Sequence, residues 1–407
     1  MQIITPHYIM LQDRVVTNLS VAFDKKIEKI APFDELLDLF PDAKVTTLRE
    51  HSLLMPGLIN AHVHIEFSKN KTELSYGDFL NWLYSVIENR ADLVNECGIE
   101  CMQEAIEKML DNGITTFGTI SSQAMDLQAC ADAKQNVVFF NELIGSQANM
   151  ADALFGDFVA RLDASKTVQR EGFYPAVAIH SPYSVHPVLV KKAVELAKNE
   201  KLKLTAHFME SIAEREWLDE SKGDFKAFFE KLLSQNKSVG SAKEFLNYFD
   251  NTNALLTHVT NADQEELAII ANKGHTIIHC PISNRLLGNP TLNIEALKQH
   301  NIPWILATDG LSSNYKLDLF EEMKIALFMH DKEPLLELAQ LLIKSVTLYA
   351  AKALGLNTGE IAEGKNADMI VLDLQNEPTK ELPIHLILQR YPISKVYING
   401  KLEKGEI

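Results

Sequence analysis

Short apolar runs recur along the chain, and several of them end at a histidine or an aspartate. Residues 175–179 precede His180, residues 202–206 precede His207, residues 254–257 precede His258, and residues 303–308 precede Asp309. Runs of this length, bounded by polar or turn residues, predict buried strands. The pattern therefore places side chains with acid–base or metal-binding chemistry directly after strands.

Amphipathic segments separate these runs. One apolar stripe comprises Leu189, Ala193, Leu196 and Ala197, and another comprises Met102, Ala105, Ile106, Met109 and Leu110. Spacings of three and four residues predict helices with one buried face, and Asn112-Gly113 is a stop signal for the second helix. Helices that alternate with strands predict that the strands are parallel.

Eight strand candidates end near Asn60, Ile120, Leu143, His180, His207, His258, Cys280 and Asp309. Eight such units over roughly residues 56–350 fit the α/β class, as a (β/α)8 TIM barrel, which typically needs about 250 residues plus insertions. A doubly wound sheet is less favoured, because no Gly-x-Gly-x-x-Gly motif follows a strand. In a barrel the polar strand ends meet at one mouth, where active sites lie.

The two ends of the chain carry short β-rich runs, at residues 2–4, 21–23 and 45–48 and again at 369–374 and 396–399. Neither end is long enough to bury a core of its own. The pattern favours one small β-sandwich built from residues 1–54 and 357–407, beside a barrel of residues 55–356. Two unrelated surface extensions are the alternative.

Charge and cysteine content limit the expected partners and compartment. The 407 residues carry a formal net charge of −16 without a basic run, which argues against nucleic-acid and anionic-membrane partners. No apolar run approaches the ~20 residues of a membrane span, and the first six residues lack a signal-peptide pattern. Four cysteines in so long a chain predict a reduced, cytoplasmic protein. Cys97 and Cys101, four apart on an expected helix, favour packing over a zinc knuckle.

The first expected barrel strand carries His62-Val63-His64. Side chains two apart on a strand point the same way, so both imidazoles can converge on one metal ion. Alone, such a pair is weak support, because two histidines on one strand face are often polar surface. The histidines and the aspartate expected at the other strand ends strengthen the metal hypothesis.

His62-x-His64, His207, His258 and Asp309, in this order on successive strands, resemble the amidohydrolase superfamily. The resemblance extends over nearly the whole chain, from residues 56–64 (PGLINAHVH) to residues 359–371 (GEIAEGKNADMIV). Residues 180–183, 207–210, 280–284 and 308–314 resemble the adenosine-type deaminases of that superfamily, including the 5'-methylthioadenosine/S-adenosylhomocysteine deaminases. The resemblance also implies the barrel and the terminal β-sandwich.

Three imidazoles and one carboxylate, from His62, His64, His207 and Asp309, would hold one divalent metal, with zinc favoured and iron as the alternative. Bound Zn²⁺ lowers the pKa of a coordinated water from 15.7 to about 7, which supplies hydroxide near neutral pH. Binuclear relatives carry a bridging lysine at the end of the fourth strand, where this chain has His180. A mononuclear site is therefore expected, although Glu142 leaves a bridging carboxylate open.

Glu210 lies three residues after His207, where a strand gives way to a helix. A carboxylate there can take a proton from the attacking water and pass it to a ring nitrogen, as general base and then acid. The alternative is an ordinary carboxylate in the first turn of a helix. The resemblance implies that His258 and Asp309 orient the water, and that Asp309 also moves a proton.

The resemblance and the residue types suggest candidates for binding a small nucleoside: His180, Trp82, Asp78, Glu142, Ser283, Asn284, Arg285 and Ser313. Asp78 would bond ribose hydroxyls, and Arg285 would pair with a substrate carboxylate. Trp82, together with Phe79, could equally be plain core. The insertion at residues 219–253 could cap the pocket or form an oligomer interface.

The resemblance implies hydrolytic deamination of the 6-amino group of a 5'-modified adenosine. Candidate substrates are 6-amino-6-deoxyfutalosine, which would imply a role in futalosine-route menaquinone biosynthesis, 5'-methylthioadenosine, S-adenosylhomocysteine and adenosine. Another hydrolase on the same scaffold, acting on guanine, a triazine or a carbon–halogen bond, is an alternative. A non-catalytic barrel that binds a metabolite is a further alternative, and the sequence leaves the oligomeric state open.

Overall fold

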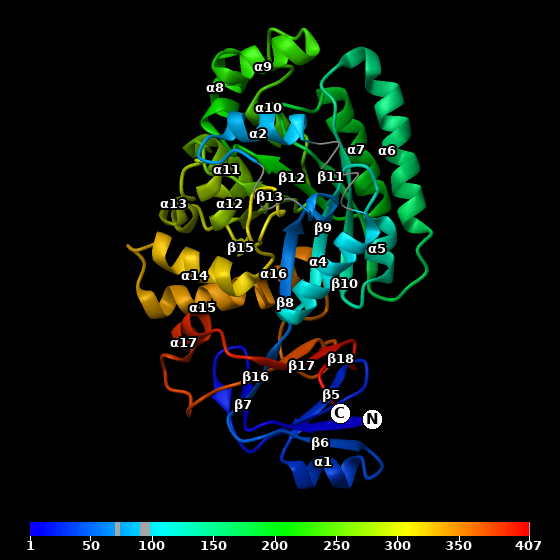
Figure 1. Cartoon of the computed structure of the whole chain (residues 1–407), viewed down its shortest axis with the longest axis vertical. Coiled ribbons are helices and arrows are strands. Elements are labelled where there is room, and N and C mark those ends of the chain that lie inside the picture. Colours follow the sequence, from blue (N-terminus) through cyan, green and yellow to red (C-terminus); the bar gives the residue numbers. More distant parts are fainter. Residues whose placement is uncertain (70–73, 90–97, 407) are drawn as a thin grey trace.

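The computed structural model describes residues 1–69, 74–89 and 98–406. Eight parallel strands form one sheet that curls into a barrel, surrounded by helices (Figure 1). In chain order the strands are β8 (Leu58–Val63), β9 (Ile114–Ser121), β10 (Asn136–Leu143), β11 (Phe173–Ile179), β12 (Leu204–Phe208), β13 (Leu255–His258), β14 (Thr276–His279) and β15 (Trp304–Leu306). The (β/α)8 barrel and its eight strands are confirmed.

Helices follow the strands and cover the outside of the barrel (Figure 1). They are α2 (Phe79–Glu88), α4 (Ile99–Asp111), α5 (Leu127–Asp132), α6 (Ala151–Lys166), α7 (Pro187–Glu200), α8 (Ile212–Glu220), α9 (Asp224–Leu233), α10 (Ala242–Asn247), α11 (Gln264–Asn272), α12 (Pro281–Leu286), α13 (Ile294–Gln299), α14 (Leu319–Met329), α15 (Leu335–Ser345) and α16 (Leu348–Leu354). The apolar stripes expected from sequence lie on α4 and α7, whose buried residues face the strands.

The inside of the barrel is a packed apolar core. Ile59, Phe140, Leu255 and Ile305 belong to one buried cluster, which also includes residues of α16 such as Ala350. A second, larger cluster fills the space between the strands and the outer helices. Because both faces of every strand are buried, the strands read as nearly continuous apolar runs.

Barrel closure depends on a side chain of the first strand. Asn60 donates to the hydroxyl of Thr308 at 2.7 Å and accepts from the Thr308 backbone N–H at 3.1 Å. The Asp309 N–H donates to the carbonyl of His62 at 3.1 Å. These bonds tie the first strand to the segment after the eighth and fix His62 and Asp309 side by side.

Strands from the two ends of the chain form two further sheets beside the barrel (Figure 1). One has the order β5 (Ile27–Ala31), β4 (Ser20–Phe23), β1 (Gln2–Thr5) and β6 (Lys44–Thr47), with α1 (Phe33–Leu39) next to it. The other has the order β18 (Lys401–Lys404), β17 (Ile393–Ile398), β16 (Met369–Asp373), β7 (Ser52–Pro56), β2 (Tyr8–Met10) and β3 (Val15–Val16), with α17 (Leu382–Gln389). Both ends of the chain contribute to the second sheet.

The insertion after β12 buries its apolar face within the molecule. Phe225 on α9 contacts Phe79 on α2 and Tyr183 after β11, with ring centroids 6.0 and 4.6 Å apart. Phe229 stacks on Trp217 at 4.9 Å. These contacts connect the insertion with Phe79 and Tyr183, and both the capping role and the oligomer-interface role remain predictions.

Two further observations bear on the sequence expectations. Cys130 and Cys280 are free and buried, whereas Cys101 is disulfide-bonded, contrary to the expectation of a fully reduced chain; Cys97 lies outside the described residues. Within the described ranges, no helix combines the length and apolarity needed to cross a membrane.

Candidate active site

A cavity of about 180 Å³ opens at the carboxyl ends of the barrel strands. Its lining comprises His64, Phe67, Phe79, Trp82, Leu83, Val86, Ile87, Ser122, Glu142, Ile144, His180, Tyr183, His207, Glu210, His258, Asp309 and Ser312. The lining therefore combines histidines and carboxylates with apolar and aromatic side chains. Side chains at or after the carboxyl ends of seven of the eight barrel strands, all except β14, converge here, as the sequence predicts for strand ends of a barrel.

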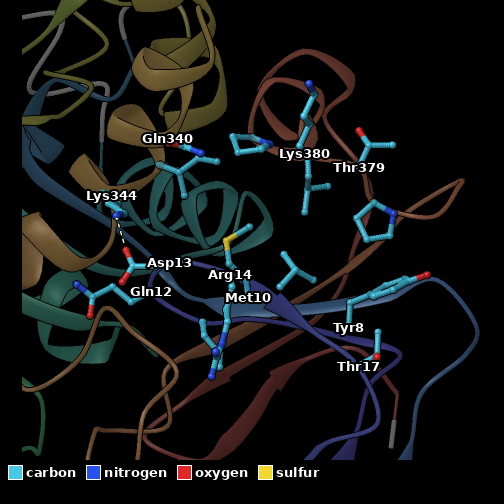
Figure 2. Close-up of a pocket in the computed structure, with 16 residues that line it drawn as sticks. Tyr8, Met10, Gln12, Asp13, Arg14, Thr17, Gln340, Lys344, Thr379 and Lys380 are labelled. Atoms are coloured by element: carbon cyan, nitrogen blue, oxygen red, sulfur yellow. Dashed lines mark hydrogen bonds and ion pairs between the residues drawn. The ribbon is translucent and has the colours of Figure 1, made fainter.

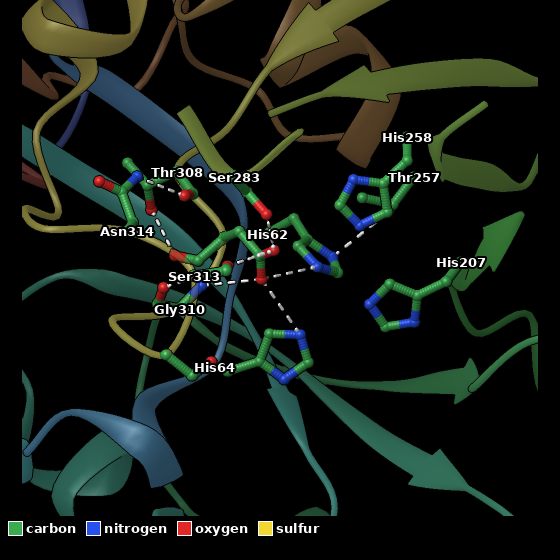
Figure 3. A network of polar contacts seen from close by, with 12 residues as sticks. His62, His64, His207, Thr257, His258, Ser283, Thr308, Gly310, Ser313 and Asn314 are labelled. Carbon is green, nitrogen blue, oxygen red and sulfur yellow. Dashed lines mark hydrogen bonds and ion pairs between the residues drawn. The ribbon is translucent and has the colours of Figure 1, made fainter. Parts of the chain in front are cut away.

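The four predicted metal ligands fall into two overlapping groups whose potential ligand atoms lie within 4.8 Å of one another: His62, His64 and Asp309 in one, and His62, His207 and His258 in the other. Figure 3 shows the four histidines of these groups close together. His62 Nε2 and His64 Nε2 lie 3.7 and 3.4 Å from Asp309 Oδ1. The ring of His207 lies 4.9 Å from that of His62 and 5.5 Å from that of His64, between centroids. These side chains come from separate strands and the segments that follow them, so only the fold brings them together.

Hydrogen bonds on the far side of two rings leave their inner nitrogens free. His207 Nδ1 lies 2.9 Å from the carbonyl oxygen of His180, which can only accept, so His207 carries its proton there. His62 Nδ1 lies 3.3 Å from the hydroxyl of Thr257. His62 Nε2 is buried without a hydrogen-bond partner among the described residues. An unprotonated inner nitrogen backed by a carbonyl, as in His207, is typical of metal-binding histidines, and the unpartnered Nε2 of His62 lies beside it, so these residues fit a divalent ion.

Asp309 is held in a cradle of donors. Its Oδ2 accepts from the hydroxyls of Ser283 at 2.7 Å and Ser313 at 2.8 Å, and its Oδ1 accepts from the Gly310 N–H at 2.8 Å. Burial opposes ionisation, but the neighbouring histidines and the Ser283 hydroxyl hold the pKa of Asp309 below its ordinary value. The cradle thus favours the anionic, ligand-competent form.

The segment after β15 also needs an unusual backbone. Asp309 has a φ of 59°, in the left-handed region. A Cβ on Gly310 would lie 2.8 Å from the Cβ of His64, so glycine permits the close approach of this segment to the first strand. Strain of this kind, worth about 1–3 kcal/mol per residue, is concentrated at functional sites.

Glu210 and His258 both line the cavity and lie close to each other. Glu210 Oε1 lies 3.5 Å from His258 Nε2 and 3.4 Å from Asn289 Nδ2. Burial, together with the negative charges of Asp309 and Glu214, raises the pKa of Glu210 well above its ordinary value. A carboxyl group with an elevated pKa is suited to exchanging protons near neutral pH.

Glu142 and His180 also line the cavity. Glu142 Oε2 accepts from the hydroxyl of Ser122 at 2.6 Å, while Oε1 is buried without a partner among the described residues. Burial lowers the pKa of His180 to about 3, so its ring is neutral, and its Nδ1 lies 2.6 Å from the hydroxyl of Ser184. Both groups can therefore hydrogen-bond with a bound molecule.

The remaining candidates for substrate binding are distributed unevenly. Trp82 lines the cavity and donates from Nε1 to the carbonyl of Ser312 at 2.9 Å. Asn284 is fully buried behind His258 rather than in the cavity. Asp78 and Arg285 are exposed and do not line the cavity. Asp78 instead caps α2, accepting from the Asn81 N–H at 2.9 Å.

Residues 53–402 match the family described as "Amidohydrolase family". This chain belongs to the amidohydrolase family. An aminodeoxyfutalosine deaminase of a Nitratiruptor species is 46% identical over 403 residues, covering 98% of this chain and 99% of that one. An adenosine deaminase of Helicobacter pylori is 35% identical over 393 residues, covering 95% of each. The crystal structure of Helicobacter pylori aminofutalosine deaminase with methylthio-coformycin has a TM-score of 0.92 at 33% identity, covering 99% of this chain and 100% of that one.

Sequence reasoning missed one support of this amidohydrolase site. Glu66, two residues after His64, is buried and accepts from the backbone N–H groups of Ser122, Gln123 and Met125 at 2.9, 3.0 and 3.0 Å. It thereby holds the loop after β9, which carries the Ser122 hydroxyl that bonds Glu142. A glutamate just after a strand is compatible with many roles, so the sequence held no signal for this one.

A larger cavity of about 580 Å³ lies away from the mouth, among β2, β3, α15 and the segment that leads into α17 (Figure 2). It holds an ion pair between Asp13 and Lys344 at 2.9 Å. None of the four candidate metal ligands lines it, and neither does Glu210. The volume of a cavity alone therefore does not identify the candidate active site, whereas the convergence of the strand ends does.

Proposed function

We propose that this protein hydrolyses the 6-amino group of a 5'-modified adenosine, releasing ammonia and the inosine-type product, with one divalent metal ion per chain. The observation that carries the proposal is Glu210, a buried carboxyl with a raised pKa that lies 3.5 Å from His258 and lines the same cavity as the candidate ligands His64, His207 and Asp309. The family and the full-length similarity to deaminases support the same chemistry.

Zinc is the metal we propose, held by His62, His64, His207 and Asp309. A set of three imidazoles and one carboxylate suits zinc, and iron accepts the same set. When bound, the ion supplies a Lewis acid that makes a water molecule nucleophilic near neutral pH.

The chain's own residues then move the protons. Glu210 takes one proton from the attacking water and delivers it to ring nitrogen N1 as the oxygen bonds to C6. His258 and Asp309 orient the water, and its second proton passes through Asp309 to the amino nitrogen. The C6–N bond breaks with its electron pair leaving on nitrogen, and ammonia departs.

The polar and the apolar side chains that line the cavity suggest an orientation for the bound nucleoside. The base would sit against Glu210 and the metal-binding residues, with the 5' substituent against Phe79, Trp82 and Tyr183. Glu142 Oε1, which is buried and unpartnered among the described residues, would accept a hydrogen bond from a ribose hydroxyl. An aromatic or thioether substituent suits the apolar and aromatic side chains of the lining, and 6-amino-6-deoxyfutalosine is the substrate we propose first. Arg285 lies outside the cavity, so we assign the carboxylate of that substrate no partner.

Glu142→Gln is expected to raise KM by about 10- to 100-fold with kcat nearly unchanged. A hydrogen bond to a charged acceptor contributes about 1.5–3 kcal/mol, and a neutral amide retains only part of it. The measurement is steady-state kinetics on a ribonucleoside and on its 2'- and 3'-deoxy analogues, with exposed Glu104→Gln as the control. If the wild type and Glu142→Gln discriminate against the deoxy analogues equally, Glu142 does not contact the ribose.

The proposed function is tested by following loss of adenine absorbance and release of ammonia with the zinc-loaded protein. The panel comprises 6-amino-6-deoxyfutalosine, 5'-methylthioadenosine, S-adenosylhomocysteine, adenosine, guanine and a chlorotriazine. We expect kcat/KM to be at least about tenfold higher with an apolar 5' substituent than with adenosine, from ~1.4 kcal/mol of added burial. Preference for guanine or the triazine, or no ammonia from any of the six, would overturn the proposal.

A further inference from the structure

Four buried side chains form a continuous row from the cavity to the outside of the barrel. His258 Nδ1 lies 2.8 Å from Asn284 Oδ1, and Asn284 Nδ2 lies 3.4 Å from His279 Nδ1. His279 Nε2 lies 3.0 Å from His330 Nε2 at the end of α14. No member is more than 8% exposed.

The side-chain amide of Asn284 determines which ring nitrogens donate and which accept along this row. An amide oxygen only accepts, so His258 carries its proton on Nδ1; an amide nitrogen only donates, so His279 Nδ1 is unprotonated. A neutral His279 then carries its proton on Nε2 and donates it to His330 Nε2. Burial lowers the pKa of His279 well below its ordinary value and that of His330 to about 4, which agrees with neutral rings.

The tautomer of His258 determines which hydrogen bonds its ring can form in the cavity. With its proton on Nδ1, His258 presents the lone pair of Nε2 toward Glu210 and the reacting water. The opposite tautomer would place a proton there, and His258 could no longer accept a hydrogen bond from the water. An imidazole outside this row would be free to adopt either tautomer.

We propose that His279 and His330 are positioning residues that fix the tautomer of His258 from outside the barrel. The inference rests on the proposed function for its effect on turnover, but the tautomer itself is a property of the protein alone. His279 contributes from the last residue of β14, and His330 from the segment after α14, so the outer helix layer is coupled to the cavity.

The test uses full-length protein labelled with ¹⁵N in the histidine rings. Ring nitrogen shifts of wild type without metal are expected to report Nδ1–H at His258 and Nε2–H at His279. In His330→Leu the acceptor for His279 Nε2–H is lost, so His279 can carry its proton on Nδ1 and the Asn284 amide can turn over to present its nitrogen to His258. Both rings are then expected to show mixed tautomers. His330→Gln, whose amide oxygen can accept from His279, is expected to restore the wild-type pattern. His275→Gln is the control, because His275 is equally buried but accepts from the Ala254 N–H instead.

Kinetics on the zinc-loaded proteins give the second readout. We expect kcat of His330→Leu to fall by about 10- to 100-fold, the size of effect found for residues that orient a functional side chain through a hydrogen bond. KM and metal content should not change, and His330→Gln should recover the wild-type kcat. A wild-type His258 protonated on Nε2, or an unchanged tautomer and kcat in His330→Leu, would overturn the proposal. The wild-type spectrum decides even where a variant does not fold. Absence of deaminase activity in wild type would contradict the proposed function, but the spectra would still decide which tautomer His258 adopts.

Discussion

Glu210→Gln is expected to bind the metal ion as wild type does and to lose nearly all turnover. Glutamine is close in size and can keep the contact with Asn289, but it cannot accept a proton from water or deliver one to the ring. Proton transfer by a positioned side chain contributes about 10²–10⁴-fold to rate. Because Glu210 serves in both addition and protonation, we expect a loss in kcat of about 10³-fold or more, with KM changed little.

Measurements of kcat, KM and metal content on the same preparation separate this from a loss of metal. Glu216→Gln on the helix that follows Glu210 is the matched control, since Glu216 is exposed and does not line the cavity. It is expected to match wild type in all three quantities. A Glu210→Gln variant with near-normal kcat would remove Glu210 from the mechanism, whatever its metal content.

The strand ends could be predicted from the sequence because one physical rule connects pattern to position. A buried parallel strand reads as a short apolar run, and its carboxyl end faces the mouth of the barrel. His207, His258 and Asp309 each come at or directly after the end of such a run. Once eight strand–helix units are recognised as a barrel, these three residues are expected at the same mouth. The structure places all three at one cavity.

Other parts of the site depend on details that periodicity does not carry. Alternation alone puts Asn60 on the same side as His62, but β8 departs from regular register between Asn60 and Val63. Asn60 is therefore bonded to Thr308 and closes the barrel. His258 also has a left-handed backbone conformation, with a φ of 73°, which the hydrophobic pattern of the sequence does not predict.

The misplaced candidates have a common cause. Asp78 was assigned a ribose contact on a helix face, yet aspartate directly before an apolar helix is also a typical N-cap, and that is the position it takes. Arg285 follows a strand end, but it lies on α12, whose buried residues include Ser283 and Asn284, and its own side chain is exposed. In both cases the residue type is compatible with a binding role, but its position, at the start of α2 or on α12, leaves the side chain at the surface.

Metal analysis of the active protein is expected to give one equivalent per chain, and removal of the metal by a chelator is expected to abolish turnover until zinc is restored. His207→Ala should lose the metal together with activity, because the free nitrogen that the His180 carbonyl orients is removed. Its thermal stability should no longer respond to added zinc, since only a folded state that binds the ion is stabilised by it.

Glu142 provides the test that distinguishes one metal from two. Glu142, His180 and His207 bring potential ligand atoms within 4.8 Å of one another, so a second ion sharing His207 is geometrically conceivable. The chain nevertheless has no lysine at the end of the fourth strand, and Glu142 already accepts from Ser122. We therefore expect wild type and Glu142→Gln both to hold one equivalent. Two equivalents in wild type falling to one in Glu142→Gln would establish a bridging carboxylate and replace the mononuclear mechanism.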